Sequence, residues 1–170
     1  MKTWIAAAGV AAVLTVVAGL GAAEKWDDAL ESEVETAIGT FTAESVEGTT
    51  DYHLLLDGKE LLRNEGASVF MSPVIKGKTQ DFMLAFVSTG GIACLGEFVV
   101  WRVQKPVVLS KPFGTCTDVF KARTVGDRLI VTMPGYVPHP DELTEAQRKK
   151  AEKSVVTYTY ENGVLTGPPR

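Results

Sequence analysis

Turn-forming residues recur so often through residues 52–166 that only short, extended elements fit between them. Asp57-Gly58, Gly126-Asp127 and Asn162-Gly163 each separate two apolar or alternating runs, which is the pattern of a tight β-hairpin. Only one short helical pattern, within residues 142–153, interrupts these runs, whereas a parallel α/β architecture needs helices between successive strands. We therefore predict a mainly β fold, either an antiparallel β-sandwich or a small barrel. The expected strands cover residues 52–56, 59–63, 69–75, 81–88, 97–103, 107–110, 119–124, 128–133, 155–160 and 164–165.

An N-terminal amphipathic helix is expected over residues 24–39, before the first of these strands. Apolar residues recur there every four positions, and acidic residues fill most of the positions between them. Acidic side chains early in a helix complement its dipole, and Gly39 is a suitable C-terminal stop. The apolar stripe that would face the body of the protein comprises Trp26, Leu30, Val34 and Ile38. A polar connection, residues 40–50, is expected to follow.

One short late helix is expected within residues 142–153, between two strands. Thr144 and Gln147 stand three positions apart, as in a capping box. Acidic residues come early and basic residues come late, which matches the helix dipole. Because the segment has few large apolar residues, we expect its polar face to be solvated. A basic docking surface is the functional alternative.

A secretory signal peptide is predicted at residues 1–23. Lys2 is the only charge before Glu24, the intervening segment is apolar or small, and Gly21-Ala22-Ala23 supplies small residues at a cleavage site. Cleavage after Ala23 would leave a single β-rich domain, residues 24–170, in the periplasm or outside the cell. The alternative is an uncleaved membrane anchor, because residues 4–23 are uncharged and long enough to span a bilayer.

Charge is unevenly distributed along the rest of the chain. The whole sequence has a net charge of −4, which argues against a nucleic-acid partner because such proteins need a basic surface. Residues 24–51 contain nine acids and one base, whereas residues 52–170 contain twelve acids and fifteen bases. The acids could simply solvate the first helix. Alternatively, that helix packs on a basic sheet or presents an acidic face to a basic partner.

The sequence contains two cysteines, Cys94 and Cys116. Exported proteins meet an oxidising environment, so the simplest prediction is one disulfide between them. Closing a loop of this size is worth roughly 3 kcal/mol in the chain-entropy description. A catalytic thiol or a zinc site is the alternative. A catalytic thiol would need His53 or His139 as its base. A zinc site would need both histidines together with both cysteines, and the sequence shows no clustered metal-ligand spacing.

The surroundings of the two cysteines form a pair of motifs. Gly90-Gly91-x-Ala93-Cys94 is followed by Phe113-Gly114-Thr115-Cys116-x-Asp118. This pair resembles a pattern in uncharacterised, exported, β-rich bacterial proteins, over about residues 50–135. The resemblance implies a protein of the bacterial envelope. The motif pair is structural, so it transfers no catalytic residue to this chain.

Candidate functional residues follow from loops rather than from a catalytic motif. The sequence contains no G-x-S-x-G nucleophile elbow, no H-E-x-x-H motif and no calcium loop. Tyr136 and His139 lie in a proline-flanked loop that could form a binding tip, although Tyr136 could equally cap the core. Gly90 and Gly91 are expected to form turns and are further contact candidates. A carboxylate pair for glycan hydrolysis could come from four aspartates beside turns, Asp51, Asp57, Asp118 and Asp127.

These observations favour a non-enzymatic binding module of the bacterial periplasm. An inhibitor or immunity protein that blocks an envelope-acting enzyme is the most concrete form of this hypothesis, and it requires neither a metal nor a cofactor. An envelope hydrolase with carboxylate chemistry is the first alternative. The second is a membrane-anchored structural or assembly factor, which would keep residues 4–23.

The first prediction concerns the N-terminus. Because small residues precede an abrupt acidic segment, we expect signal peptidase to cleave after Ala23. Intact-mass measurement of the protein recovered from the periplasm should give a chain that begins at Glu24. Recovery of the uncleaved chain in the membrane fraction would instead support the anchored alternative.

Overall fold

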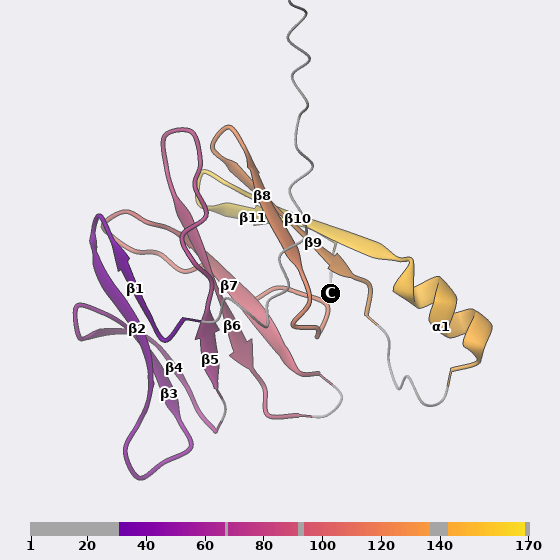
Figure 1. Ribbon diagram of the computed structural model, residues 1–170, viewed down its shortest axis with the longest axis horizontal. Coiled ribbons are helices and arrows are strands. Elements are labelled where there is room, and N and C mark those ends of the chain that lie inside the picture. The colour runs from indigo at the N-terminus through magenta and orange to yellow at the C-terminus, as the bar shows by residue number, and fades with distance from the viewer. Residues whose placement is uncertain (1–30, 67, 92–93, 137–142, 169–170) are drawn as a thin grey trace, which may run out of the picture.

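The computed structural model describes residues 31–66, 68–91, 94–136 and 143–168 (Figure 1). These residues form eleven strands and one helix, and every strand pairing between neighbours is antiparallel. A mainly β, antiparallel fold is therefore confirmed. The elements are β1 (Glu33–Thr36), β2 (Gly39–Ser45), β3 (Tyr52–Leu56), β4 (Lys59–Asn64), β5 (Val69–Met71), β6 (Phe82–Ser88), β7 (Gly96–Arg102), β8 (Lys121–Val125), β9 (Arg128–Pro134), α1 (Glu145–Glu152), β10 (Val155–Glu161) and β11 (Val164–Thr166).

The strands form three sheets that follow one another along the chain. The first sheet has the order β1-β2-β3-β4, the central sheet β5-β6-β7, and the third sheet β11-β10-β9-β8. Neighbouring strands are also neighbours in sequence, as in a series of hairpins, and α1 protrudes beside the third sheet (Figure 1). None of the three sheets closes into a barrel within the described residues, so the small-barrel alternative is wrong.

The central sheet is buried on both faces. Along β6, alternate side chains point in opposite directions, as in any strand. Met83 and Ala85 belong to the hydrophobic cluster shared with the first sheet, whereas Phe82, Leu84 and Phe86 belong to the cluster shared with the third sheet. The fold is therefore a stack of three layers rather than the two of a simple sandwich, and the first and third sheets each have one outer face (Figure 1).

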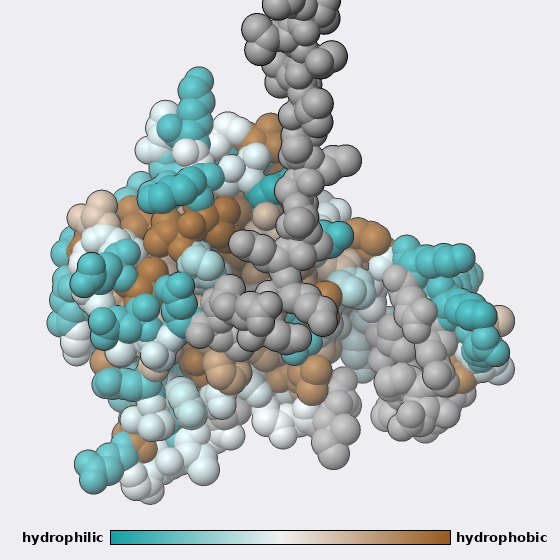
Figure 2. All heavy atoms as spheres, viewed as in Figure 1, coloured by the Kyte–Doolittle hydropathy of each residue, from teal (hydrophilic) through white to brown (hydrophobic). Residues whose placement is uncertain are grey.

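Aromatic side chains fill both clusters. Between the first and central sheets, the ring centroids of Phe41 and Trp101 are 5.4 Å apart. Between the central and third sheets, Phe82 meets Tyr160 edge to face at 6.2 Å. Such ring pairs add about 0.5–1.5 kcal/mol each to the effect of burial. In the view of Figure 2, hydrophilic residues lie over the side of the first sheet and over α1, with apolar residues between them.

The predicted helix over residues 24–39 is wrong in the part that the structure describes. Residues 24–30 lie outside the described residues, and Glu33–Thr36 form strand β1. An apolar spacing of four residues is an even number, so Val34 and Ile38 would share a face on a strand as well as on a helix. Val34 is buried between two exposed glutamates and pairs with Phe41, which makes the local period two.

Residues 40–50 also differ from their prediction as a polar connection. Phe41 and Ala43 are buried, and they alternate with threonine and glutamate along β2. Thr36 and Gly39 form the ends of a tight turn between β1 and β2, and the Thr36 hydroxyl donates a 2.7 Å hydrogen bond to the Gly39 carbonyl. Gly39 has a φ of +135°, so its role is that of a turn residue and not of a helix stop.

The other expected strands match within one or two residues at each end, with two exceptions. Of the strand expected over residues 69–75, only Val69–Met71 forms β5. Residues 107–110 form no strand; instead, the Ser110 hydroxyl accepts a hydrogen bond from the Val100 amide at the edge of β7. Strand β8 begins at Lys121, so Val119 lies in the preceding loop. The late helix is confirmed as α1, and Thr144 and Gln147 form the reciprocal hydrogen bonds of a capping box at 2.9 and 3.3 Å.

A substitution in the central sheet tests the three-layer core. Leu84 is fully buried, so Leu84→Ala should lower the free energy of unfolding by about 2–5 kcal/mol. The matched control is Leu95→Ala, at a leucine that is 49% exposed and should cost less than about 1 kcal/mol. Denaturant unfolding followed by far-ultraviolet circular dichroism measures both. Equal losses would contradict the assigned core.

Candidate binding surface at the disulfide

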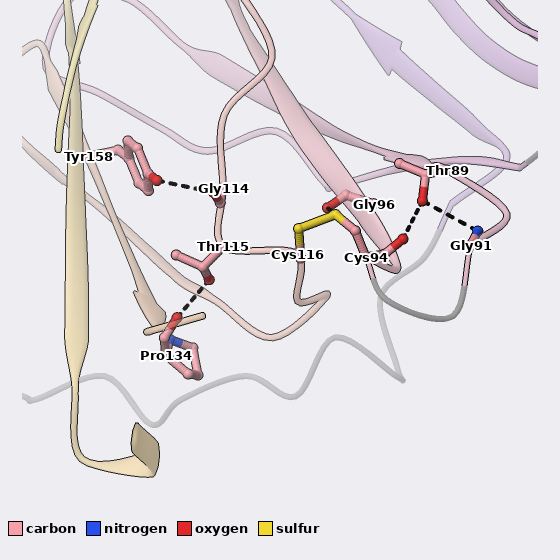
Figure 3. The surroundings of a disulfide bond; sticks show 9 residues. All are labelled: Thr89, Gly91, Cys94, Gly96, Gly114, Thr115, Cys116, Pro134 and Tyr158. Atoms are coloured by element: carbon pink, nitrogen blue, oxygen red, sulfur yellow. Dashed lines mark hydrogen bonds between the residues drawn. A yellow bond between two sulfur atoms is a disulfide. The ribbon is translucent and has the colours of Figure 1, made fainter. Parts of the chain in front are cut away.

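A disulfide joins the two loops at one end of the central sheet. Cys94 follows β6 and Cys116 precedes β8, and their Cα atoms are 4.5 Å apart with an S–S bond of 2.11 Å (Figure 3). The predicted pairing is therefore confirmed. Both cysteines are used in this bond, so neither supplies the free thiol that the catalytic or zinc alternatives need.

The loop that carries Cys94 is tied to itself by hydrogen bonds around Thr89. The Thr89 hydroxyl donates to the Cys94 carbonyl and accepts from the Gly91 amide at 3.4 Å (Figure 3). The Thr89 amide donates to the Leu95 carbonyl at 3.0 Å. Gly90 has a φ of +67°, a conformation that glycine adopts without strain. The predicted role of Gly90 as a turn residue is thus confirmed, while its role in contacts stays a prediction.

The loop that carries Cys116 is fastened to the third sheet. The Thr115 hydroxyl donates to the Pro134 carbonyl at 2.6 Å, and the Tyr158 hydroxyl donates to the Gly114 carbonyl at 3.1 Å (Figure 3). Before the cysteine, Phe113 exchanges two backbone hydrogen bonds with Phe98 of the central sheet, at 2.7 and 2.8 Å. Residues 113–116 therefore connect the central sheet, the third sheet and the other loop.

Three large apolar side chains leave these tied loops and face solvent. Leu95 is 49% exposed and directly follows Cys94; Val119 is 57% exposed and lies three residues after Cys116. Tyr136 is 48% exposed and lies two residues after Pro134. We call these three residues the disulfide-end surface. Exposed aromatic and aliphatic side chains on fixed loops are typical of contact sites.

Not all of the predicted site residues lie in the loops near the disulfide. Gly90, Gly91 and Tyr136 belong to the loops that meet near the disulfide. His139 lies outside the described residues. His53 lies elsewhere, on β3 of the first sheet, where its Nδ1 is 3.0 Å from a carboxylate oxygen of Glu60.

Sequence reasoning missed Leu95 and Val119 as candidates. The position of Leu95 does indicate exposure, because it is a large apolar residue within a glycine-rich turn. Val119 begins the strand expected over residues 119–124, so its sequence context gives no sign that it lies in an exposed loop. The supporting residues Thr115 and Tyr158 carry no sequence signal of their own, since their partners are backbone carbonyls.

The aspartates proposed for hydrolysis serve separate turns. Asp51 accepts hydrogen bonds from Arg63 and from the Gly66 amide, and chiefly the Arg63 bond lowers its pKa. Asp57 accepts from the Thr40 amide at 3.0 Å, at the opposite end of that sheet's hairpins. A general acid in glycan hydrolysis needs a raised pKa, whereas the Arg63 hydrogen bond lowers the pKa of Asp51.

Asp127 connects the third sheet to the central one. Its carboxylate accepts from the Thr79 amide at 2.6 Å, from the Thr79 hydroxyl at 2.7 Å and from the Gln80 amide at 3.3 Å. The Thr79 amide, followed by the Thr79 hydroxyl, lowers the pKa of this carboxyl. The side chain therefore fixes the turn between β8 and β9 against residues 79–80.

Two kinds of site are not found in the part of the chain that the structure describes. No group of three or more histidine, cysteine, aspartate or glutamate side chains is placed to hold a metal ion there. Over the same residues, no helix has both the length and the apolar character needed to cross a membrane.

Comparison of the chain with models of protein families, with curated proteins and with solved structures finds no match.

The hydrogen bonds of Asp127 predict an acid-dependent loss of stability. A carboxyl whose pKa is lowered by folding stabilises the fold above its unfolded pKa, and this effect is lost as pH falls through the folded value. Thermal unfolding between pH 6 and pH 2 should therefore show a smaller pH dependence for Asp127→Asn than for the parent chain.

The control for this experiment is Asp118→Asn, at an aspartate in the loop that precedes β8, whereas Asp127 lies in the turn that follows this strand. The stability of Asp118→Asn should depend on pH as that of the parent chain does, because the Thr79 and Gln80 amides donate their hydrogen bonds to Asp127. Identical curves for the parent and Asp127→Asn would show that the contact contributes nothing to stability.

Proposed function

We propose that this protein is an exported, non-enzymatic binding module that recognises a protein partner through the disulfide-end surface. The observation that carries the proposal is the exposure of Leu95, Val119 and Tyr136, each within three residues of a residue held by the disulfide or by a hydrogen bond between loop and sheet. Apolar side chains of this size usually contribute to a core. Here Leu95 directly follows Cys94, Val119 lies three residues after Cys116, and Tyr136 lies two residues after Pro134, whose carbonyl accepts the Thr115 hydrogen bond.

Fixed loops favour binding because little conformational entropy remains to be lost. Ordering a mobile side chain or loop on association costs about 0.5–1.5 kcal/mol per immobilised side chain, and pre-formed loops avoid part of this cost. The disulfide holds the Cys94 loop, and the Thr115 and Tyr158 hydroxyls hold the Cys116 loop. A tyrosine between two aliphatic residues then offers the aromatic anchor that dominates many protein interfaces.

The disulfide also supports a location outside the cytoplasm. Such bonds form and persist in oxidising compartments and are rare in reducing ones. In the periplasm, the exposed apolar side chains of the disulfide-end surface could contact an envelope-acting enzyme. The specific form of the proposal is therefore an inhibitor or immunity protein that inserts this surface into such an enzyme.

A pull-down from an envelope extract tests this proposal. The parent chain should retain one enzyme at a one-to-one ratio, and Val119→Ala should weaken that complex about tenfold or more, equivalent to about 1.4 kcal/mol. The matched control is Val164→Ala, since Val164 is 60% exposed against 57% for Val119 but lies on β11. Leu95→Ala and Tyr136→Ala should behave as Val119→Ala does.

Two results would contradict the proposal. One is retention of no partner by a folded parent chain. The other is an equal affinity of the parent, the three disulfide-end variants and Val164→Ala. Catalytic turnover by the parent chain that is lost in an aspartate-to-asparagine variant with an intact fold would favour the hydrolase alternative.

A further inference from the structure

The first and third sheets each leave one face uncovered by the described residues, and these outer faces point in opposite directions. Val34 of β1 is buried toward the central sheet, so its neighbours Glu33 and Glu35 lie on the outer face, and both are exposed. In the third sheet, Leu129 and Val131 of β9 are buried on the face that packs against the central sheet. The register places Lys121 and Arg123 of β8 opposite Thr132 and Ile130, on the outer face of the third sheet.

The two outer faces carry matched but opposite charges. Glu33 and Glu35 occupy alternate positions on β1, an edge strand, and Lys121 and Arg123 occupy alternate positions on β8, also an edge strand. Alternate residues on a strand are about 6.6 Å apart, so the two acids and the two bases have the same spacing. Within the described part of the chain, none of these four side chains forms an ion pair.

The neighbouring strands match as well. Glu33 and Glu35 lie opposite Thr42 and Thr40 of β2, and Lys121 lies opposite Thr132. Arg123 lies opposite Ile130, so the cross-strand neighbours of all four charged residues are uncharged. The uneven distribution of charge along the sequence also separates charge between the sheets. Residues 31–66, which contain all four strands of the first sheet, have nine acids and two bases.

We propose that the outer face of the first sheet of one copy binds the outer face of the third sheet of a second copy. Like faces repel, because two β1 edges would bring four glutamates together and two β8 edges would bring four cations together. Opposite faces attract and have the same charge spacing. Since the two faces lie on opposite sides of the stack, the contact joins copies head to tail in a row.

The size of the faces sets the strength of the contact. A four-stranded sheet face measures about 20 by 20 Å, so one contact buries on the order of 800 Å² in total. This is below the range of stable, specific interfaces and within that of weak encounters, so the association is weak and appears at high protein concentration. Exposed charges are screened within about 10 Å at 0.1 M salt and within a shorter distance at higher salt. The association should therefore weaken as salt increases.

Sedimentation velocity of the purified chain, from about 10 to 500 μM, tests this inference. At 20 mM NaCl the weight-average sedimentation coefficient should rise with concentration, and at 500 mM NaCl it should stay at the monomer value. The variants K121E/R123E and E33K/E35K should each remain monomeric at 20 mM NaCl. A monomer at every concentration of the parent chain would overturn the inference.

Mixing the two variants gives the decisive result. One variant then has two acidic outer faces and the other has two basic ones, so an equimolar mixture should associate although neither variant does alone. This outcome also shows that both variants are folded. The control K149E/K150E changes the net charge by the same amount on α1, and it should associate as the parent does. Failure of the mixture to associate, or loss of association in the control, would contradict a contact between these faces.

Discussion

Burial of the central sheet on both faces is the constraint on which the rest of this structure depends. Each residue from Phe82 to Phe86 is buried, and alternate residues supply two different hydrophobic clusters. A strand of this kind cannot carry a polar site within its length, because an unpaired polar group there would cost several kcal/mol. It also needs a sheet on each side. Polar and chemically active side chains are thereby confined to the outer faces and to the loops at the ends of the stack.

The disulfide matters because of where this architecture places it. It joins the loop after β6 to the loop before β8, and hydroxyls of Thr115 and Tyr158 fasten the second loop to the third sheet. The exposed apolar residues near it are therefore held by the same contacts that connect the layers. Shape and covalent constraint thus account for the proposed binding function better than any ionisable group does, since the pKa values of Asp51 and Asp127 are lowered by structural hydrogen bonds.

The sequence contains enough information for most of the strands, because Asp57-Gly58, Gly126-Asp127 and Asn162-Gly163 define hairpins whose flanking periods are clear. It misleads around Val34, where an apolar spacing of four fits a helix and a strand equally well. The third layer also cannot be deduced, because a continuous apolar run indicates burial of both faces without saying what covers them. The pairing of Cys94 with Cys116 follows from their number and context, whereas the exposure of Val119 depends on where β8 begins.

Because both faces of the central sheet are buried by neighbouring sheets, we predict that this sheet folds without the disulfide, which acts locally to fix the loops of the disulfide-end surface. Hydrogen–deuterium exchange of the parent chain and of Cys94→Ser/Cys116→Ser, read by mass spectrometry, tests it directly. We predict faster exchange in the variant at residues 89–96 and 114–119, with β6 and β7 remaining the most protected strands in both proteins. Loss of protection throughout β6 and β7, or unchanged exchange in the two loops, would contradict the account.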